Sequence, residues 1–406
     1  MVGFNKCTFL IIMETNMTTR MAKEDAFTLY QQLCDEVFGA GAVQIKQAPS
    51  NPVTGALRHL DDFNMFKMNF KERLKRLERR FRGTSSYPSL LEQVKLVADP
   101  KNWEGAFAEL VAYDAMWNDQ IITVMELDKT LNVAESFAGE MGYKATNEDG
   151  FLPDYGLYFD VKILADTVGG ILKGIIDDAI TNSGQVSHCD IRPEYPLDDD
   201  DEDYSGVNRK KLCNELTCFL KAHSSVTTGE KLFRSTVLPR LSYRILWGVG
   251  VNSTMGEYNP YRHAEATKHL VFKRYTKKIM KNEMFMLVLV RFPWYNNLIS
   301  SFDDADQVYY RNLARRTFCG YCKDNTAMKV IVPQYGGQES VFDVSRNLAG
   351  IIFIDDNSIK EDSYTCNVVM NPNAKNTHPM AYPYLMSLVK KGDRRGLYDD
   401  LKYDNY

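Results

Sequence analysis

The sequence lacks the features that define several large protein classes. No apolar stretch reaches the roughly 18 residues that a membrane-spanning helix needs. The eight cysteines are scattered over 406 residues and form no framework of short spacings, so we expect reduced thiols and a cytoplasmic protein. The net charge is only −4, which excludes coating of a nucleic acid by bulk positive charge.

Several catalytic and binding motifs are also missing. The chain has no Gly-x-x-x-x-Gly-Lys, Gly-x-Gly-x-x-Gly, Gly-x-Ser-x-Gly or His-Glu-x-x-His sequence, so nothing supports ATP use, dinucleotide binding, serine hydrolysis or a zinc protease. Cys319 and Cys322 form a single Cys-x-x-Cys, and only Cys366 and His378 follow it as loose zinc ligands. A structural zinc site needs four ligands. The acidic run at residues 198–203 is typical of a solvated loop.

The composition, with 44% hydrophobic, 25% charged and 12% aromatic residues, is that of a globular protein. The length predicts two or three domains, or one domain with large insertions. Strand and helix patterns alternate from about residue 100 to 290, which predicts an α/β fold with a mixed sheet flanked by helices. The wholly apolar segment 284–290 predicts a central strand. We expect a flexible extension (1–21), a helical N-terminal region (22–100), a core (101–290) with an insertion around 192–265, and an α+β C-terminal region (291–406).

Two segments combine helical spacing with basic side chains. Phe66, Phe70, Leu74, Leu77 and Phe81 recur at intervals of three and four, and the opposite face carries eight basic residues against two acidic ones between positions 65 and 82. That face is either a solvated helix surface or a phosphate-binding one. The second basic helix is expected at residues 269–281. The candidate nucleic-acid-binding residues on the two helices are Lys75, Arg76, Arg79, Arg80, Lys273 and Lys277.

Weaker candidates lie toward the C-terminus. Arg311, Arg315 and Arg316 either contact phosphate or form salt bridges. Arg291 and Trp294 flank the end of the predicted central strand, and for Trp294 a place in the core is favoured over a place in a cleft.

The most informative segment is residues 151–163. Side chains two apart on a strand share a face, so Tyr158, Asp160 and Lys162 line one face while the other face is wholly apolar. Asp154 follows Pro153 at the turn that leads into this strand. Asp149, in Glu148-Asp149-Gly150, lies shortly before this turn.

Two carboxylates placed close together repel unless a cation lies between them. Their hard oxygen ligands suit Mg²⁺ or Mn²⁺. A lysine beside such a metal can orient or deprotonate an attacking water and stabilise charge on a phosphate. The alternative interpretation of Asp160 and Lys162 is purely structural: a surface ion pair on an ordinary strand.

Pro153-Asp154 followed by Asp160-Val161-Lys162 resembles the motif of the PD-(D/E)xK nuclease superfamily. Glu109, on an upstream helix, matches the further acid that this family often supplies. The five residues between Asp154 and Asp160 are few for this family, so Asp149 is an alternative first acid. The resemblance covers residues 100–190 directly, and implies a restriction-endonuclease-like αβββαβ core. It also implies a metal-dependent endonuclease acting on DNA (RNA is not excluded), with Asp154, Asp160 and Glu109 as metal ligands and Lys162 as a catalytic residue.

A stand-alone nuclease of this kind would fit an effector of bacterial anti-phage defence. The alternative is a non-catalytic nucleic-acid-binding or protein-interaction component of a multi-subunit complex, with a partner such as a helicase. A homo-oligomer is compatible with either function.

Overall fold

The computed structural model describes residues 26–58, 64–130, 147–164, 167–184, 188–195, 201–204, 206–249, 283–294, 309–318, 331–334, 337–359, 364–389 and 397–398, and the single residues 264, 279 and 329. Several sequence-based expectations lie outside these residues. They are the extension at 1–21, the basic residues Lys273 and Lys277, and the Cys319–Cys322 pair.

A seven-stranded mixed sheet organises the chain, as the α/β prediction required. Its order is β1-β2-β3-β7-β10-β11-β12. Strands β3, β7 and β10 run parallel, while β1, β2 and β3 form antiparallel pairs. The strands are β1 (Glu126–Thr130), β2 (Asn147–Leu152), β3 (Leu157–Ile163), β7 (Met284–Arg291), β10 (Leu348–Asp356), β11 (Tyr364–Met370) and β12 (Leu397–Tyr398).

Strand β7 is the central strand that its apolar sequence predicts. All eight of its residues are buried. Met286 and Val288 contribute to one hydrophobic cluster, and Leu287 and Leu289 contribute to a second cluster on the opposite face. A parallel strand flanked on both sides by other strands and covered on both faces has this composition.

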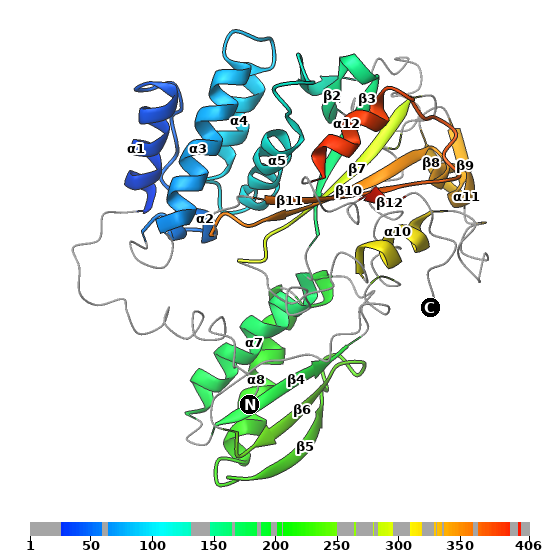
Figure 1. The fold of residues 1–406 in the computed structure, drawn as a ribbon. Coiled ribbons are helices and arrows are strands. Elements are labelled where there is room, and N and C mark those ends of the chain that lie inside the picture. Colours follow the sequence, from blue (N-terminus) through cyan, green and yellow to red (C-terminus); the bar gives the residue numbers. More distant parts are fainter. Residues whose placement is uncertain are drawn as a thin grey trace, which may run out of the picture.

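Helices cover both faces of the sheet (Figure 1). One face carries α1 (Ala26–Phe38), α2 (Pro52–Ala56), α3 (Asn64–Phe81), α4 (Tyr87–Leu96), α5 (Trp103–Met116) and α12 (Ala381–Leu388). The other carries α10 (Arg311–Thr317) and α11 (Val341–Ser345), with Ala264 and Ile279 buried beside them. A hairpin of β8 (Ile331–Gln334) and β9 (Gly337–Ser340) adjoins α11. Within the described residues, no helix has the length and apolar character that a bilayer crossing needs.

The sheet crosses the domain boundaries expected from the sequence. Strands β10, β11 and β12 come from the expected C-terminal region, yet β10 pairs with β7 from Leu348 to Asp355, with one irregularity between Leu348 and Gly350. The N-terminal helices α1 to α4 share one hydrophobic cluster with α5 and the sheet. Residue 290 therefore does not end the core, because later strands complete the same sheet.

An inserted unit lies between β3 and β7. It comprises α7 (Thr167–Ser183), β4 (Cys189–Glu194), the 3₁₀ turn η4 (Asp201–Tyr204), α8 (Gly206–Ala222), β5 (Gly229–Arg234) and β6 (Ser242–Trp247). Its three-stranded sheet and two helices enclose a hydrophobic cluster of their own. The insertion thus begins at α7, upstream of the expected position 192. Helix α7 follows the Asp-x-Lys strand in sequence but packs on α8.

Helix α3 shows the predicted apolar stripe, whose members Phe66, Phe70, Leu74, Leu77 and Phe81 are all fully buried. Its basic face differs from both expectations. Arg73 is also fully buried, and its guanidinium lies 2.7 Å from Asp356 Oδ1 and 3.7 Å from Asp114 Oδ2. Arg76 and Arg80 both bind the buried Asp114. These arginines join α3 to α5 and β10, and only the outermost basic side chains of the helix face solvent.

Replacing Arg73 with alanine should be strongly destabilising. The change leaves Asp356 and Asp114 buried with one cationic partner fewer, which costs about 3–5 kcal/mol when a buried pair is broken. The matched control is Arg79→Ala on the exposed side of the same helix, with an expected change within about 0.5 kcal/mol. Urea denaturation followed by circular dichroism measures both. Equal midpoints for the two variants would contradict a stabilising role for Arg73.

Candidate active site

Four predicted or alternative site residues meet where α5 crosses the β2–β3 hairpin. Glu109 is on α5, Asp149 is on β2, and Asp160 and Lys162 are on β3. Helix α5 is buried on nearly all sides, so it is held firmly against β3 and β7. The four side chains come from regular elements with fixed backbones, which is the arrangement that holds reacting groups in place best.

The two faces of β3 are divided as the sequence predicts. Leu157, Phe159 and Val161 belong to the hydrophobic cluster beneath α5. Asp160 is nevertheless fully buried, whereas Lys162 is about a fifth exposed. Burying a carboxylate is costly unless it is paired, and Lys162 supplies the pairing charge.

Lys162 lies between the two aspartates. Its Nζ is 2.5 Å from Asp160 Oδ2 and 3.6 Å from Asp149 Oδ2. The same ammonium group donates to the carbonyl oxygen of Val161 at 2.9 Å. Asp149 is fixed from the other side, because its Oδ2 accepts the Val161 backbone N–H at 2.7 Å. The cross-strand hydrogen bond holds the Asp149 carboxylate over β3.

The β2–β3 register places Asp149 beside Asp160. Gly150 pairs with Phe159 in this ladder, and the ring of Phe159 lies over Gly150. A Cβ at position 150 would come within 2.0 Å of that ring, so only glycine fits there. The neighbouring positions Asp149 and Asp160 follow in the same register.

Asp154, the first metal ligand expected from the sequence, lies elsewhere. It is exposed in the 3₁₀ turn η3 (Pro153–Tyr155). Its Oδ2 accepts hydrogen bonds from the Thr123 backbone N–H at 3.1 Å and from the Thr123 hydroxyl at 2.8 Å. Asp154 therefore fastens the turn to the segment before β1, and Asp149 is the acid that the structure brings to Asp160 and Lys162.

Glu109 joins the site through Tyr113, one helical turn further along α5. The Tyr113 hydroxyl lies 2.7 Å from Glu109 Oε2 and 3.2 Å from the carbonyl oxygen of Asp149. Burial, with the nearby Asp149 charge as a second cause, raises the pKa of Glu109 to about 8, and Lys162 offsets only part of this effect. Three acids thus surround one lysine, and the site carries surplus negative charge.

Asp128 is a fourth acid that the sequence reasoning missed. It contributes to the raised pKa of Glu109 as a nearby negative charge, which places it at the same end of the site. Its φ is +49°, and it is the one non-glycine residue with positive φ among those described. Asp128 also interrupts the ladder between β1 and β2, since Leu127 and Lys129 are paired with residues of β2 but Asp128 is not. Strained backbone of this kind is concentrated at functional sites.

The donor chemistry of the site suits a hard divalent cation. Carboxylate oxygens of Asp149, Asp160 and Glu109 are the ligand type that Mg²⁺ and Mn²⁺ prefer. Over the described ranges, no three such groups are close enough together to form a metal-binding cluster, and the Lys162 ammonium lies between the two aspartates. The residues fit a cation in charge and donor type, provided that Lys162 moves from its place between the carboxylates.

The other predicted contacts have structural partners. Arg291 binds Asp355 through two nitrogens at 2.6 and 2.9 Å. Trp294 packs on Phe66 and Phe107 in the core and donates to Asp356. Arg315 and Arg316 are almost fully buried on α10. Arg291 thus forms an ion pair, and Trp294 belongs to the core, as the sequence favoured.

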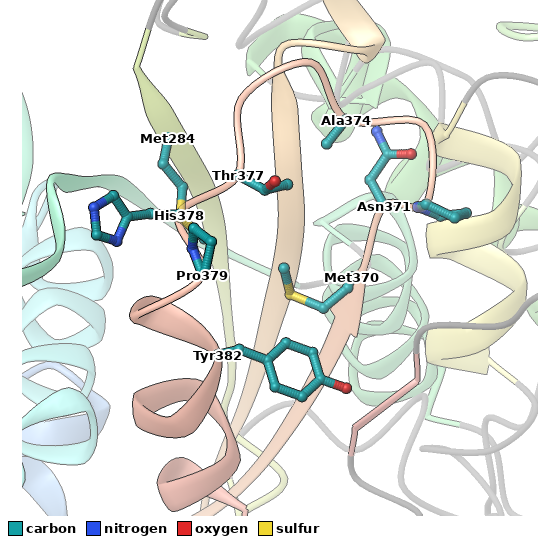
Figure 2. Close-up of a pocket in the computed structure, with 9 residues that line it drawn as sticks. Met284, Met370, Asn371, Ala374, Thr377, His378, Pro379 and Tyr382 are labelled. Carbon is teal, nitrogen blue, oxygen red and sulfur yellow. The ribbon is translucent and has the colours of Figure 1, made fainter.

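A cavity of about 490 Å³ lies at the start of β7 and the end of β11 (Figure 2). Met284 and Met370 line it together with the loop and helix that follow β11, including His378, Pro379 and Tyr382. The amide of Asn371 is already bonded to the Ser345 and Leu348 carbonyl oxygens. None of the four acid and lysine residues of the candidate site lines this cavity, so the two are separate features.

Comparison of the chain with protein-family models, with curated proteins and with solved structures finds no match in any of the three. The chemistry of the site therefore rests on its own residues.

Glu109→Gln should change how stability depends on pH. Folded Glu109 keeps its proton up to a pKa of about 8, while the unfolded carboxyl loses it near 4.5. The wild type therefore loses stability as the pH rises between these values, and glutamine cannot ionise. In the presence of EDTA, we expect the variant to gain on the order of 1–3 kcal/mol relative to the wild type at the upper end of this range. Thermal unfolding across the range measures the difference, and a constant difference would contradict the raised pKa.

Asp128→Gly and Asp128→Ala separate the conformational role of Asp128 from its charge. Both remove the carboxylate, so both should lower the pKa of Glu109. Alanine keeps the Cβ, which disfavours positive φ by about 1–2 kcal/mol, whereas glycine removes it. We expect the alanine variant to be the less stable of the two in urea denaturation, and equal stability would show that the backbone at position 128 is unstrained.

Proposed function

We propose that the protein is a metal-dependent phosphodiesterase, and that its substrate is DNA. The observation that supports this function is the meeting of Glu109, Asp149, Asp160 and Lys162 on α5 and the β2–β3 hairpin. A helix, an antiparallel hairpin carrying the two acids and the lysine, and a neighbouring parallel strand agree with a restriction-endonuclease-like core. Asp149 takes the place that the sequence resemblance offered to Asp154.

Each residue of the candidate site has a role in this proposal that follows from its side-chain chemistry. Asp149 and Asp160 would hold Mg²⁺, with Glu109 as a further ligand or as the group that positions a water. The metal, when bound, stabilises the charge that develops on the phosphate oxygens. Lys162 would leave the aspartates and align the attacking water, and its charge would further stabilise the phosphate. Tyr113 keeps Glu109 and β2 at a fixed separation.

The substrate surface differs from the one expected. Arg76 and Arg80 are bound to Asp114 and Asp119. Lys75 and Arg79 are exposed and would contact a phosphate backbone, Lys75 after release from its surface pair with Glu72. These residues position a duplex and carry no sequence information. A cytoplasmic role in anti-phage defence remains a prediction from the resemblance.

The test is cleavage of plasmid DNA with Mg²⁺ or Mn²⁺. Asp149→Asn, Asp160→Asn and Lys162→Ala should each lower the rate on the order of a hundredfold or more, because the first two lose a metal ligand and the third loses the group that aligns the water. The matched control is Asp154→Asn, which removes a carboxylate bound only to Thr123 and should cut like the wild type. Loss of cutting in the control with retention in Asp149→Asn would reverse the assignment of the first acid.

A binding experiment keeps the proposal testable if an activator is required for cutting. Mn²⁺ binding, measured by electron paramagnetic resonance, should be present in the wild type and in Asp154→Asn and absent from Asp149→Asn and Asp160→Asn. A wild type that binds DNA in a salt-sensitive manner but neither binds Mn²⁺ nor cleaves would favour the non-catalytic alternative, in which Lys162 pairs with the aspartates permanently.

A further inference from the structure

Strand β5 is an exposed edge of the inserted unit. The order of the three-stranded sheet is β4-β6-β5, so among the residues that the structure describes β5 has a partner strand on one side only. Five of its six residues are exposed, and Phe233 is half-buried. Figure 1 shows β5 at the outer margin of the unit. An edge of this kind presents unpaired backbone N–H and C=O groups to another strand.

The two faces of β5 are fixed by its register with β6. Phe233 pairs with Tyr243 and stacks on Phe219, so Phe233 and Lys231 are on the side of the hydrophobic cluster. Glu230, Leu232 and Arg234 are on the opposite, outer side. Leu232 is 53% exposed, an unusual position for a leucine on a strand whose neighbours are charged.

The outer side of β5 is complementary to itself. When two copies of a strand pair antiparallel about a twofold axis, residues opposite each other point to the same side of the joined sheet. With Leu232 on the axis, Glu230 of each copy faces Arg234 of the other, and the two Leu232 side chains meet. On the inner side, Lys231 faces Phe233. Opposite charges directly across a ladder stabilise the pairing.

Neighbouring registers lack this match. A shift that puts Lys231 on the axis sets two lysines against each other. A shift that puts Phe233 on the axis sets Leu232 against Arg234 and leaves Glu230 without an opposite charge. Like charges across a ladder are destabilising, so the charge pattern selects a single register.

We propose that β5 is a self-association surface, at which two copies of this chain join their three-stranded sheets into one six-stranded sheet. The pairing is antiparallel, with Leu232 on the twofold axis and two Glu230–Arg234 ion pairs. This proposal stands independently of the proposed nuclease activity, since β5 carries none of the candidate catalytic residues.

Sedimentation velocity on the full chain tests the proposal through charge reversal. The wild type should show a concentration-dependent dimer. Glu230→Arg alone and Arg234→Glu alone should each weaken dimerisation about tenfold or more, because two attractive pairs become repulsive. The double variant Glu230→Arg, Arg234→Glu should restore it, since the opposite charges again face each other.

Two controls separate the interface from folding and net charge. Lys210→Glu, at an exposed position of α8, makes the same charge change as Arg234→Glu and should leave the dimer unchanged. Leu232→Asp places two carboxylates on the axis and should abolish the dimer. The Glu230 variants lose a contact with Arg244. If circular dichroism shows that they do not fold, Leu232→Asp tests the interface in their place. A monomeric wild type, a dimer that survives both single reversals and Leu232→Asp, or a folded double variant that stays monomeric would each overturn the proposal.

Discussion

Burial of β7 on both faces is the constraint on which the rest of the structure depends. A strand with no polar side chain before Arg291 needs a strand on each edge and a layer on each face. Strands β3 and β10 lie on the two sides of β7. A long segment of chain separates each of them from β7. Helix α5 supplies part of one layer, and in doing so it brings Glu109 to β3. The position of the candidate site is thus a consequence of covering a hydrophobic strand.

The charges of the protein fall into two kinds. Those on α3 hold elements together: Arg73, Arg76 and Arg80 converge on the buried Asp114 of α5, and Arg73 reaches Asp356 at the end of β10. Here cations and acids satisfy each other. At the candidate site the acids outnumber the cation, because Glu109, Asp149 and Asp160 share Lys162. A structural ion pair is balanced, whereas at this site burial and the Asp149 charge raise the pKa of Glu109, so that carboxyl keeps its proton at neutral pH.

The sequence predicted what depends on local periodicity and missed what depends on register and distant partners. Alternation along residues 157–163 was enough to place Asp160 and Lys162 on one face, and the stripe from Phe66 to Phe81 was enough to place the buried side of α3. The choice between Asp149 and Asp154 required the hairpin register, which depends on the fit of Phe159 over Gly150. The role of Arg73 could not be foreseen, since its partner Asp356 lies 283 positions away. The one available signal for Asp128 was an acid within an otherwise regular strand.

The inserted unit has a consequence for how the chain reaches its native state. Residues 164 to 283 separate β3 from its parallel neighbour β7, so this pairing has high contact order and closing the intervening loop costs chain entropy. The insertion encloses its own hydrophobic cluster, so it can condense first and bring the ends of the two strands toward each other. Once the inserted unit has folded, fewer flexible residues remain in the loop between β3 and β7, and closing the loop costs less chain entropy. Weakening its interior is therefore expected to slow assembly of the main sheet.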